Sequence, residues 1–154
     1  MERTITYRGK RIKDGKWLYG NLADYRFNLK FVEDKRKVIF DNIVEFATDN
    51  FGFVVEDCTV DPATVGQYIG INDSNGKGIY EGDIFTVNGK NHKVVKFIPE
   101  RAAFCIANID DLGKVYIYPW QHPDEDWWRD FKREIVIVGN IFDPEYKHLT
   151  SLLK

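Results

Sequence analysis

The strongest candidate for acid–base chemistry in this chain is the pair of carboxylates in Glu81-Gly82-Asp83. Residues i and i+2 of a β-strand face the same side, so Glu81 and Asp83 have a spacing that a catalytic acid and base could use. The alternative is a solvated strand start in which Asp83 accepts hydrogen bonds from nearby backbone amides. The sequence places no histidine, lysine or third acid to complete a mechanism. We therefore predict no catalytic residue and no enzyme, and keep Glu81 and Asp83 as an alternative hypothesis.

A second candidate is the stretch from Asp73 to Gly78, which begins like a calcium-binding loop. Such a loop needs oxygen ligands at positions 1, 3 and 5 and a carboxylate at position 12. Counted from Asp73, position 5 is Lys77 and position 12 is Ile84. A calcium ion would therefore lack the oxygen ligand at position 5 and the bidentate carboxylate at position 12. We expect a polar turn instead, in which Asp73 and Asn75 bond their own backbone. We predict no metal and no cofactor, because no metal-ligand spacing joins the three histidines, His92, His122 and His148.

The densest basic cluster lies between residues 7 and 19, in a segment that also contains aromatic residues. Aromatic rings beside basic side chains can stack bases and hold phosphates of single-stranded nucleic acid. The alternative is an ordinary hairpin in which Trp17 and Tyr7 pack inward while the lysines and arginines face water. The formal net charge of −2 counts against nucleic-acid binding, and a second basic cluster, Lys35-Arg36-Lys37, is offset by the acids Glu33-Asp34 before it. We keep this function as the runner-up, with the candidate residues Arg8, Lys10, Arg11 and Trp17.

Two adjacent tryptophans, Trp127 and Trp128, lie inside the acidic run from Asp124 to Asp130. Tryptophan is a favoured anchor in protein interfaces, so this pair is the candidate site for a protein partner or for a second copy of the chain. Alternatively, the acids face solvent and the tryptophans cover one end of the fold. We slightly favour this structural interpretation.

Composition limits where and how the protein can act. The 154 residues are 44% hydrophobic and 30% charged, which is a globular balance. No apolar run is long enough to cross a membrane, and the N-terminus lacks the apolar segment of a signal peptide. Cys58 and Cys105 stand alone in β-like segments, so we expect reduced thiols, packed as small core residues, in a cytosolic setting.

Short apolar runs between turn signals predict antiparallel strands and hairpins. Asp14-Gly15 and Asn88-Gly89 tolerate the positive φ that two-residue hairpin turns need. Asp111-Leu112-Gly113 predicts a longer hairpin loop, followed by a strand over Val115-Tyr116-Ile117-Tyr118 that is apolar on both faces. Ile135-Val136-Ile137-Val138 predicts a buried strand.

Helix signals are few. At the C-terminus, Asp143 can cap a helix that starts at Pro144, with an apolar stripe of Tyr146, Leu149 and Leu153. A weaker helix is expected over residues 124–131. We predict a mainly β protein with antiparallel hairpins, an SH3-like β-barrel in the C-terminal half and a short C-terminal helix. The expected division is an N-terminal hairpin portion, 1–62, and a barrel portion, 63–154, unless the chain is one single domain.

Three sequence blocks resemble one family. The first consists of Tyr7-Arg8-Gly9-Lys10-Arg11 followed by Gly15-Lys16-Trp17-Leu18-Tyr19-Gly20-Asn21. The second runs from Val60-Asp61-Pro62 through Thr64-Val65-Gly66-Gln67-Tyr68 to Glu81-Gly82-Asp83-Ile84, and the third is Val138-Gly139-Asn140-Ile141-Phe142-Asp143-Pro144-Glu145. Together they are similar to the YopX-like family of phage and prophage proteins. Two positions depart from the family's usual pattern, Ile69 in place of threonine and Gly78 in place of a charged residue.

The resemblance implies an origin in a phage or prophage, but it implies no biochemical activity and no binding residues. The leading hypothesis is therefore a non-enzymatic accessory protein that binds a macromolecule or assembles with itself. The expected partner is another protein or further copies of the chain, with nucleic acid as the alternative.

Overall fold

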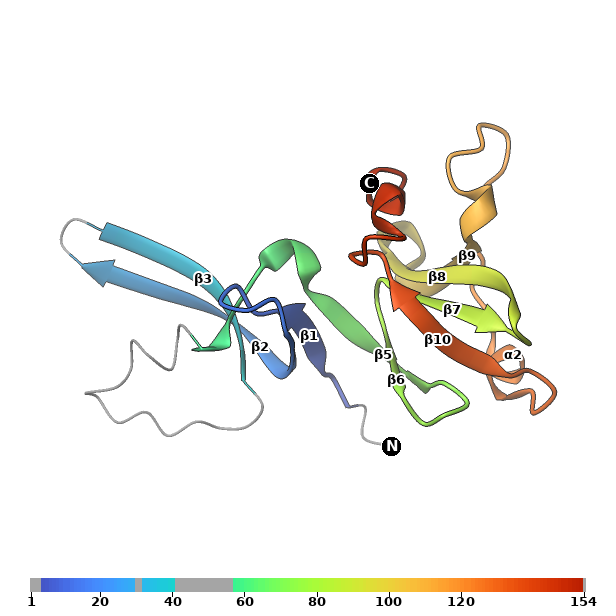
Figure 1. Cartoon of the computed structure of the whole chain (residues 1–154), viewed down its shortest axis with the longest axis horizontal. Coiled ribbons are helices and arrows are strands. Elements are labelled where there is room, and N and C mark those ends of the chain that lie inside the picture. The colour runs from blue at the N-terminus through green and yellow to red at the C-terminus, as the bar shows by residue number, and fades with distance from the viewer. Residues whose placement is uncertain (1–3, 30–31, 41–56, 154) are drawn as a thin grey trace. The chain divides into compact units, whose positions relative to one another are not determined.

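The structure is a computed structural model that describes residues 4–29, 32–40 and 57–153 (Figure 1). It is mainly β, and its strands fall into two antiparallel sheets. The chain divides into two compact units, Met1–Tyr68 and Ile69–Lys154. The expected division after residue 62 stays a prediction.

Unit 1 contains the strands β1 (Tyr7–Lys10), β2 (Trp17–Leu29), β3 (Val32–Phe40) and β4 (Thr59–Val60), followed by the 3-10 helix η2 (Pro62–Thr64). Their order across the sheet is β4-β3-β2-β1, and the start of β5 (Gly66–Asn72) pairs with β1. The predicted antiparallel hairpin around Asp14-Gly15 is present as β1 and β2.

The connection between β1 and β2 is longer than the two residues expected. Arg11 leaves β1 to form a bridge with Val60 instead. The carboxylate of Asp14 then accepts the backbone N–H of Lys16 at 3.1 Å, and Gly15 takes a φ of 69°. These contacts hold a wider turn, which sets the position of residues 11–16 against β4.

The core of unit 1 includes Val38, Ile39 and Val60, all at most 2% exposed. Gly9 lies against this core, and a Cβ atom at that position would be 3.0 Å from the Cβ of Val60 and 3.3 Å from Cδ1 of Ile39. Only glycine lets β1 approach so closely.

Unit 2 is built on a second sheet with the order β10-β7-β8-β9. Its strands are β7 (Asp83–Val87), β8 (Lys90–Ile98), β9 (Ala103–Asn108) and β10 (Ile135–Asn140), and β6 (Gly78–Tyr80) lies beside β5. Asn88 and Gly89 link β7 to β8 with φ values of 54° and 68°, which confirms the predicted two-residue turn. Among the strands described in this unit, no closed barrel is found, so the SH3-like barrel is not confirmed.

Two apolar clusters are built from alternate residues of this sheet. One contains Ile84 and Val94, and the other contains Phe85 and Val95. Since neighbouring strand residues point to opposite faces, each face of the sheet is covered. The first cluster is completed by Tyr146, Leu149 and Leu153 and the second by Ile79, Ile106 and Ile135.

The C-terminal stripe is buried as predicted, but its helix differs from the expected one. The segment forms the 3-10 helix η5 (Lys147–Ser151) rather than an α-helix that starts at Pro144. The reason is that Asp143 accepts the backbone N–H of Asn140 at 2.8 Å, so its carboxylate closes the preceding turn instead of capping a helix. The weaker prediction is confirmed by the short helix α2 (Glu125–Arg129), which Asp124 caps.

The predicted strand over residues 115–118 is wrong. After β9 and the 3-10 helix η4 (Ile109–Asp111), these residues form an irregular loop, and the chain returns to β9 only through a bridge between Ile106 and Gln121. Figure 1 shows this loop, in orange, extending from the end of β9. Gln121, rather than residues 115–118, forms the bridge to this edge of β9.

Candidate functional site

Asp83 is a structural carboxylate. It is 1% exposed and accepts the backbone N–H of Tyr80 at 2.8 Å and the side-chain amide of Asn140 at 3.3 Å. Glu81 is half-buried and accepts the backbone N–H of Phe97 at 3.0 Å, while desolvation raises the pKa of its carboxyl. The backbone bond to Asp83 is the one expected from the structural interpretation of this pair.

Asp73 organises the loop that resembled a calcium site. One carboxylate oxygen accepts the backbone N–H groups of Asn75 and Lys77, both at 2.9 Å. The other accepts the N–H of Ile137 on β10 at 3.2 Å. The predicted polar turn around Asp73 is therefore confirmed, and it also ties β10 to the turn.

The candidate nucleic-acid residues come together on one face of β1 and β2. Lys10 pairs with Trp17 and Arg8 with Tyr19, and residues that pair directly share a face. The Arg8 guanidinium lies 4.5 Å from the Trp17 ring centroid, and the Lys10 ammonium lies 5.3 Å from it. Arg8 is only 3% exposed. The interpretation in which Arg8 faces water while Trp17 packs inward is therefore wrong, because the register places both on the same side.

Arg11 is engaged within its own turn. Its guanidinium donates to both carboxylate oxygens of Asp14, at 2.9 and 2.5 Å. This pairing lowers the pKa of Asp14 well below its usual range and raises that of Arg11. Arg11 therefore lies apart from the group formed by Arg8, Lys10 and Trp17, and it stabilises the turn.

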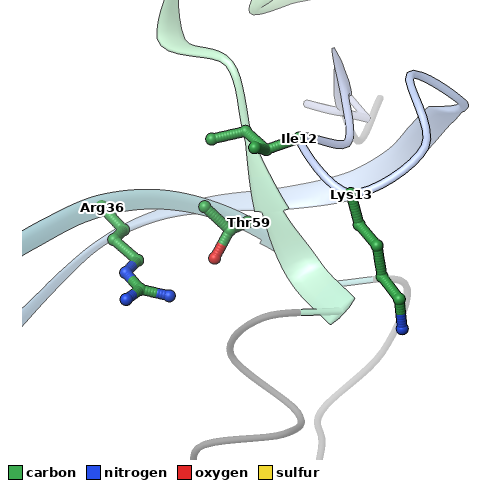
Figure 2. Close-up of a pocket in the computed structure, with 4 residues that line it drawn as sticks. All are labelled: Ile12, Lys13, Arg36 and Thr59. Atoms are coloured by element: carbon green, nitrogen blue, oxygen red, sulfur yellow. The ribbon is translucent and has the colours of Figure 1, made fainter.

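A pocket of about 410 Å³ lies beside this turn, lined by Ile12, Lys13, Arg36 and Thr59. Figure 2 shows Arg36 and Lys13 on either side of β4, with Thr59 between them. The pocket joins the two basic clusters that are separate in the sequence. Sequence reasoning missed it because the short strand β4 that brings them together carries no strong local signal.

Trp127 and Trp128 are half-buried and pack on the cluster around Phe85. Their rings meet edge to face at 4.9 Å, and Trp128 lies 6.0 Å from the Phe85 ring. Arg133 covers Trp127 at 5.0 Å and donates to its carbonyl at 2.8 Å. This arrangement matches the structural interpretation, and partner binding by the pair stays a prediction.

The loop from Val115 to Tyr118 is the most exposed run of large apolar side chains in the described chain. Val115 is 87% exposed, Tyr116 98%, Ile117 47% and Tyr118 60%. A single exposed apolar residue is ordinary, but a contiguous group marks an interaction site. The sequence shows this feature as an apolar run, which was wrongly predicted to be a strand.

Both ends of this loop are held in place. Before it, Lys114 pairs with Asp111 at 2.8 Å. After it, Gln121 and Ile106 exchange two backbone hydrogen bonds of 2.8 Å, and the Arg101 guanidinium lies 4.8 Å from the Tyr118 ring. The exposed apolar side chains therefore lie between two segments that contact the rest of unit 2.

Other kinds of site find little support in the described part of the chain. It contains no group of three or more histidine, cysteine or acidic residues that could hold a metal ion. Cys105 is buried and Cys58 half-buried, and burial raises the pKa of both thiols. Over the same residues, we find no helix with the length and apolar character to span a membrane.

Comparisons with known proteins identify a family but no activity. The family model described as "YopX protein" matches residues 6–145. No curated protein matches the chain. Among solved structures, one that is similar is the crystal structure of protein EF1440 from Enterococcus faecalis, which is 15% identical, with 99% of this chain and 100% of that chain covered and a TM-score of 0.45.

Proposed function

Because the chain belongs to the YopX family, we propose that it is a non-enzymatic, phage- or prophage-encoded module that docks onto a protein partner through residues 115–118. The observation that carries the proposal is the run of four consecutive large apolar side chains displayed at the surface. Tyrosine is enriched among interface hot spots, and two of the four side chains are tyrosines. The setting we propose is the bacterial cytoplasm.

The geometry of the loop favours binding at low entropic cost. A loop whose ends are already fixed loses less conformational freedom on binding than a free segment. The Lys114–Asp111 pair and the Gln121–Ile106 bonds provide this fixing. We therefore propose that the loop inserts into an apolar groove of its partner.

A protein partner is favoured over a membrane surface by the charges near the loop. Membrane-surface segments combine apolar residues with several basic ones that attract anionic lipids. Here Arg101 is the basic residue over Tyr118, while Lys114 is paired with Asp111 and Asp110 precedes that acid in the sequence. The proposal does not depend on an SH3-like barrel, which we retain as our interpretation of unit 2.

The proposal is tested by affinity purification of the tagged protein from its bacterial host during prophage induction. We compare the wild type with the double variant Tyr116→Ser/Ile117→Ser and with Phe131→Ser, which changes a 91% exposed apolar residue elsewhere in unit 2. One protein should co-purify in stoichiometric amounts with the wild type and with Phe131→Ser. The double variant should retain it at least tenfold less well, since each hot-spot side chain contributes roughly 2 kcal/mol or more.

Two results would count against docking through the loop. One is a wild-type protein purified alone as a monomer, and the other is a partner held equally by the double variant. If the wild type is instead a defined oligomer that the double variant breaks into monomers, the partner is a second copy. A partner held by the double variant but lost on substitution of Trp127 or Trp128 would move the site to the tryptophan pair.

Single-stranded nucleic-acid binding is the second candidate function. The observation that favours it is the stacking of Lys10 and Arg8 on the Trp17 ring, on one face of the hairpin. In fluorescence anisotropy with a single-stranded oligonucleotide, Trp17→Ala should weaken binding about tenfold, and the affinity should fall steeply with salt. Lys16→Ala, at an exposed turn position, is the control. Absent or salt-insensitive binding would remove this candidate.

A further inference from the structure

The exposed loop at residues 115–118 is flanked by one charged side chain and by one further apolar side chain. The Arg101 guanidinium lies over the Tyr118 ring, 4.8 Å from its centroid. At the start of the loop, Leu152 is 45% exposed, and a Cβ atom at Gly113 would lie 3.2 Å from its Cδ2 atom. All of these residues belong to unit 2. The docking surface therefore has an apolar side chain at its start and a basic one at its end.

Arg101 can bind an acidic group while it stays in contact with the loop. The residue is exposed, and a guanidinium that covers a ring uses its flat face, so the N–H donors at its edge stay available to a carboxylate. Among the described residues, no acid forms an ion pair with Arg101. An acid on the partner would therefore meet Arg101 beside the Tyr118 ring, at the edge of the apolar contact.

The other charges close to the loop do not compete for this role. Lys114 pairs with Asp111 at 2.8 Å, so the two charges offset each other. The hydrogen bond from Lys114 also lowers the pKa of the Asp111 carboxyl, which keeps this acid charged at neutral pH. Asp110 belongs to η4 before the loop, whereas Arg101 contacts the last residue of the loop. Arg101 therefore determines the charge at that end.

The same charge counts against a second copy of the chain as the occupant. In a two-fold symmetric dimer, one surface patch faces itself. Two loops that met in this way would bring two Arg101 guanidinium groups into one apolar interface, where like charges repel each other. A partner that carries an acid at this place gains an attraction instead, so the charge favours a different protein.

We propose that the partner is a protein whose apolar groove ends at an acidic side chain, which pairs with Arg101 while residues 115–118 and Leu152 fill the groove. This inference rests on the docking function proposed above and adds the chemistry of the partner to it. A groove without the acid would leave the guanidinium desolvated and unpaired, and such a penalty is how an interface rejects a wrong partner. Arg101 is thus the residue that selects the partner.

The test uses benzoylphenylalanine at position 116 as the probe, in the bacterial host, combined with substitutions of Arg101. Arg101→Glu should reduce the crosslinked product by about tenfold or more, because it places one acid against another. Arg101→Lys keeps the charge but not the planar pair of donors, so it should lose about threefold. The matched control is Lys132→Glu, which reverses a cation 5.9 Å from the exposed Phe131 ring. Its yield should stay within about twofold of the wild type.

A charge exchange then separates recognition from a structural role of Arg101. Mass spectrometry of the crosslinked product identifies the partner and the peptide that the loop contacts. Both proteins are purified, and calorimetry measures their affinity. Changing the acid in that peptide to lysine should weaken binding to the wild type and should restore binding to Arg101→Glu, within about fivefold of the original pair. If no acid of the peptide gives this rescue, the proposed pairing is wrong.

The outcomes distinguish the partner's chemistry from docking itself. Equal yields from the wild type, Arg101→Glu and Lys132→Glu would overturn the acidic groove and leave docking through the loop intact. No product at position 116 in the wild type would overturn both proposals. A product that joins two copies of the chain would overturn the acidic partner, and so would Arg101-dependent flotation with anionic phosphatidylglycerol vesicles, since that result identifies a lipid surface.

Discussion

Replacing Asp83 by alanine is expected to lower the free energy of unfolding of unit 2 by about 3 kcal/mol. The substitution removes the acceptor to which the Tyr80 backbone N–H and the Asn140 side-chain amide donate. Each buried donor left without an acceptor costs roughly 1–3 kcal/mol. Asp83 is 1% exposed, so water cannot replace the lost oxygens.

Urea denaturation followed by tryptophan fluorescence measures this loss, since Trp120, Trp127 and Trp128 all lie in unit 2. Asp83→Asn is the informative intermediate, because asparagine retains one acceptor oxygen and should lose roughly half as much stability. Asp110→Ala, at an exposed position, should change stability by less than about 0.5 kcal/mol. If Asp83→Ala unfolds at the same urea concentration as Asp110→Ala, the assigned role of the carboxylate is wrong.

Asp73→Ala is expected to have the next largest effect, a loss of about 2–3 kcal/mol. Asp73 accepts three backbone N–H groups, and bonds to a charged acceptor are stronger than neutral ones. The loss is smaller than for Asp83, because Asn75 and Lys77 are exposed and water can solvate their amides. Ile137 is less exposed than Asn75 and Lys77, so its bond to Asp73 should contribute the largest share.

Amide hydrogen exchange locates this effect. In Asp73→Ala, protection should fall most at Ile137 and Lys77, while unit 1 amides keep their wild-type rates. The matched control is Asn75→Ala, which preserves the backbone N–H that Asp73 accepts and should leave stability within about 0.5 kcal/mol. Unchanged protection of the Ile137 amide would show that the bond across to β10 contributes nothing.

The sequence blocks that resemble the YopX family meet in pairs in the structure. Asp83 from the second block bonds Asn140 from the third, and Ile141 donates its N–H to the Gly82 carbonyl at 2.9 Å. In unit 1, Lys10 from the first block donates its N–H to the Thr64 hydroxyl at 2.8 Å. These residues make hydrogen bonds that hold the fold together.

Some local features of this fold were predicted correctly from local signals. Asn88-Gly89 set a two-residue turn because both residues tolerate positive φ, and Tyr146, Leu149 and Leu153 were recognised as one buried stripe. The strand predicted over residues 115–118 was wrong, because an apolar run does not indicate whether a strand of the sheet is available to pair with it. The edge position was taken by Gln121, which no local pattern indicates.

The candidate sites depended on long-range pairing that the sequence does not display. Lys13 and Arg36 meet through β4, a strand of only two residues. The burial of Arg8 under Trp17 follows from the register of β1 with β2. Composition alone could only suggest that basic and aromatic residues are neighbours.

Docking through the loop at residues 115–118 is tested most directly by placing the photo-crosslinking amino acid benzoylphenylalanine at position 116 in the bacterial host. A second variant carries the same group at position 131, which is similarly exposed but lies outside the loop. We expect irradiation to join the position-116 variant to one protein, or to a second copy of the chain, and to leave the position-131 variant unlinked. No crosslink at position 116, or the same products from both positions, would contradict it.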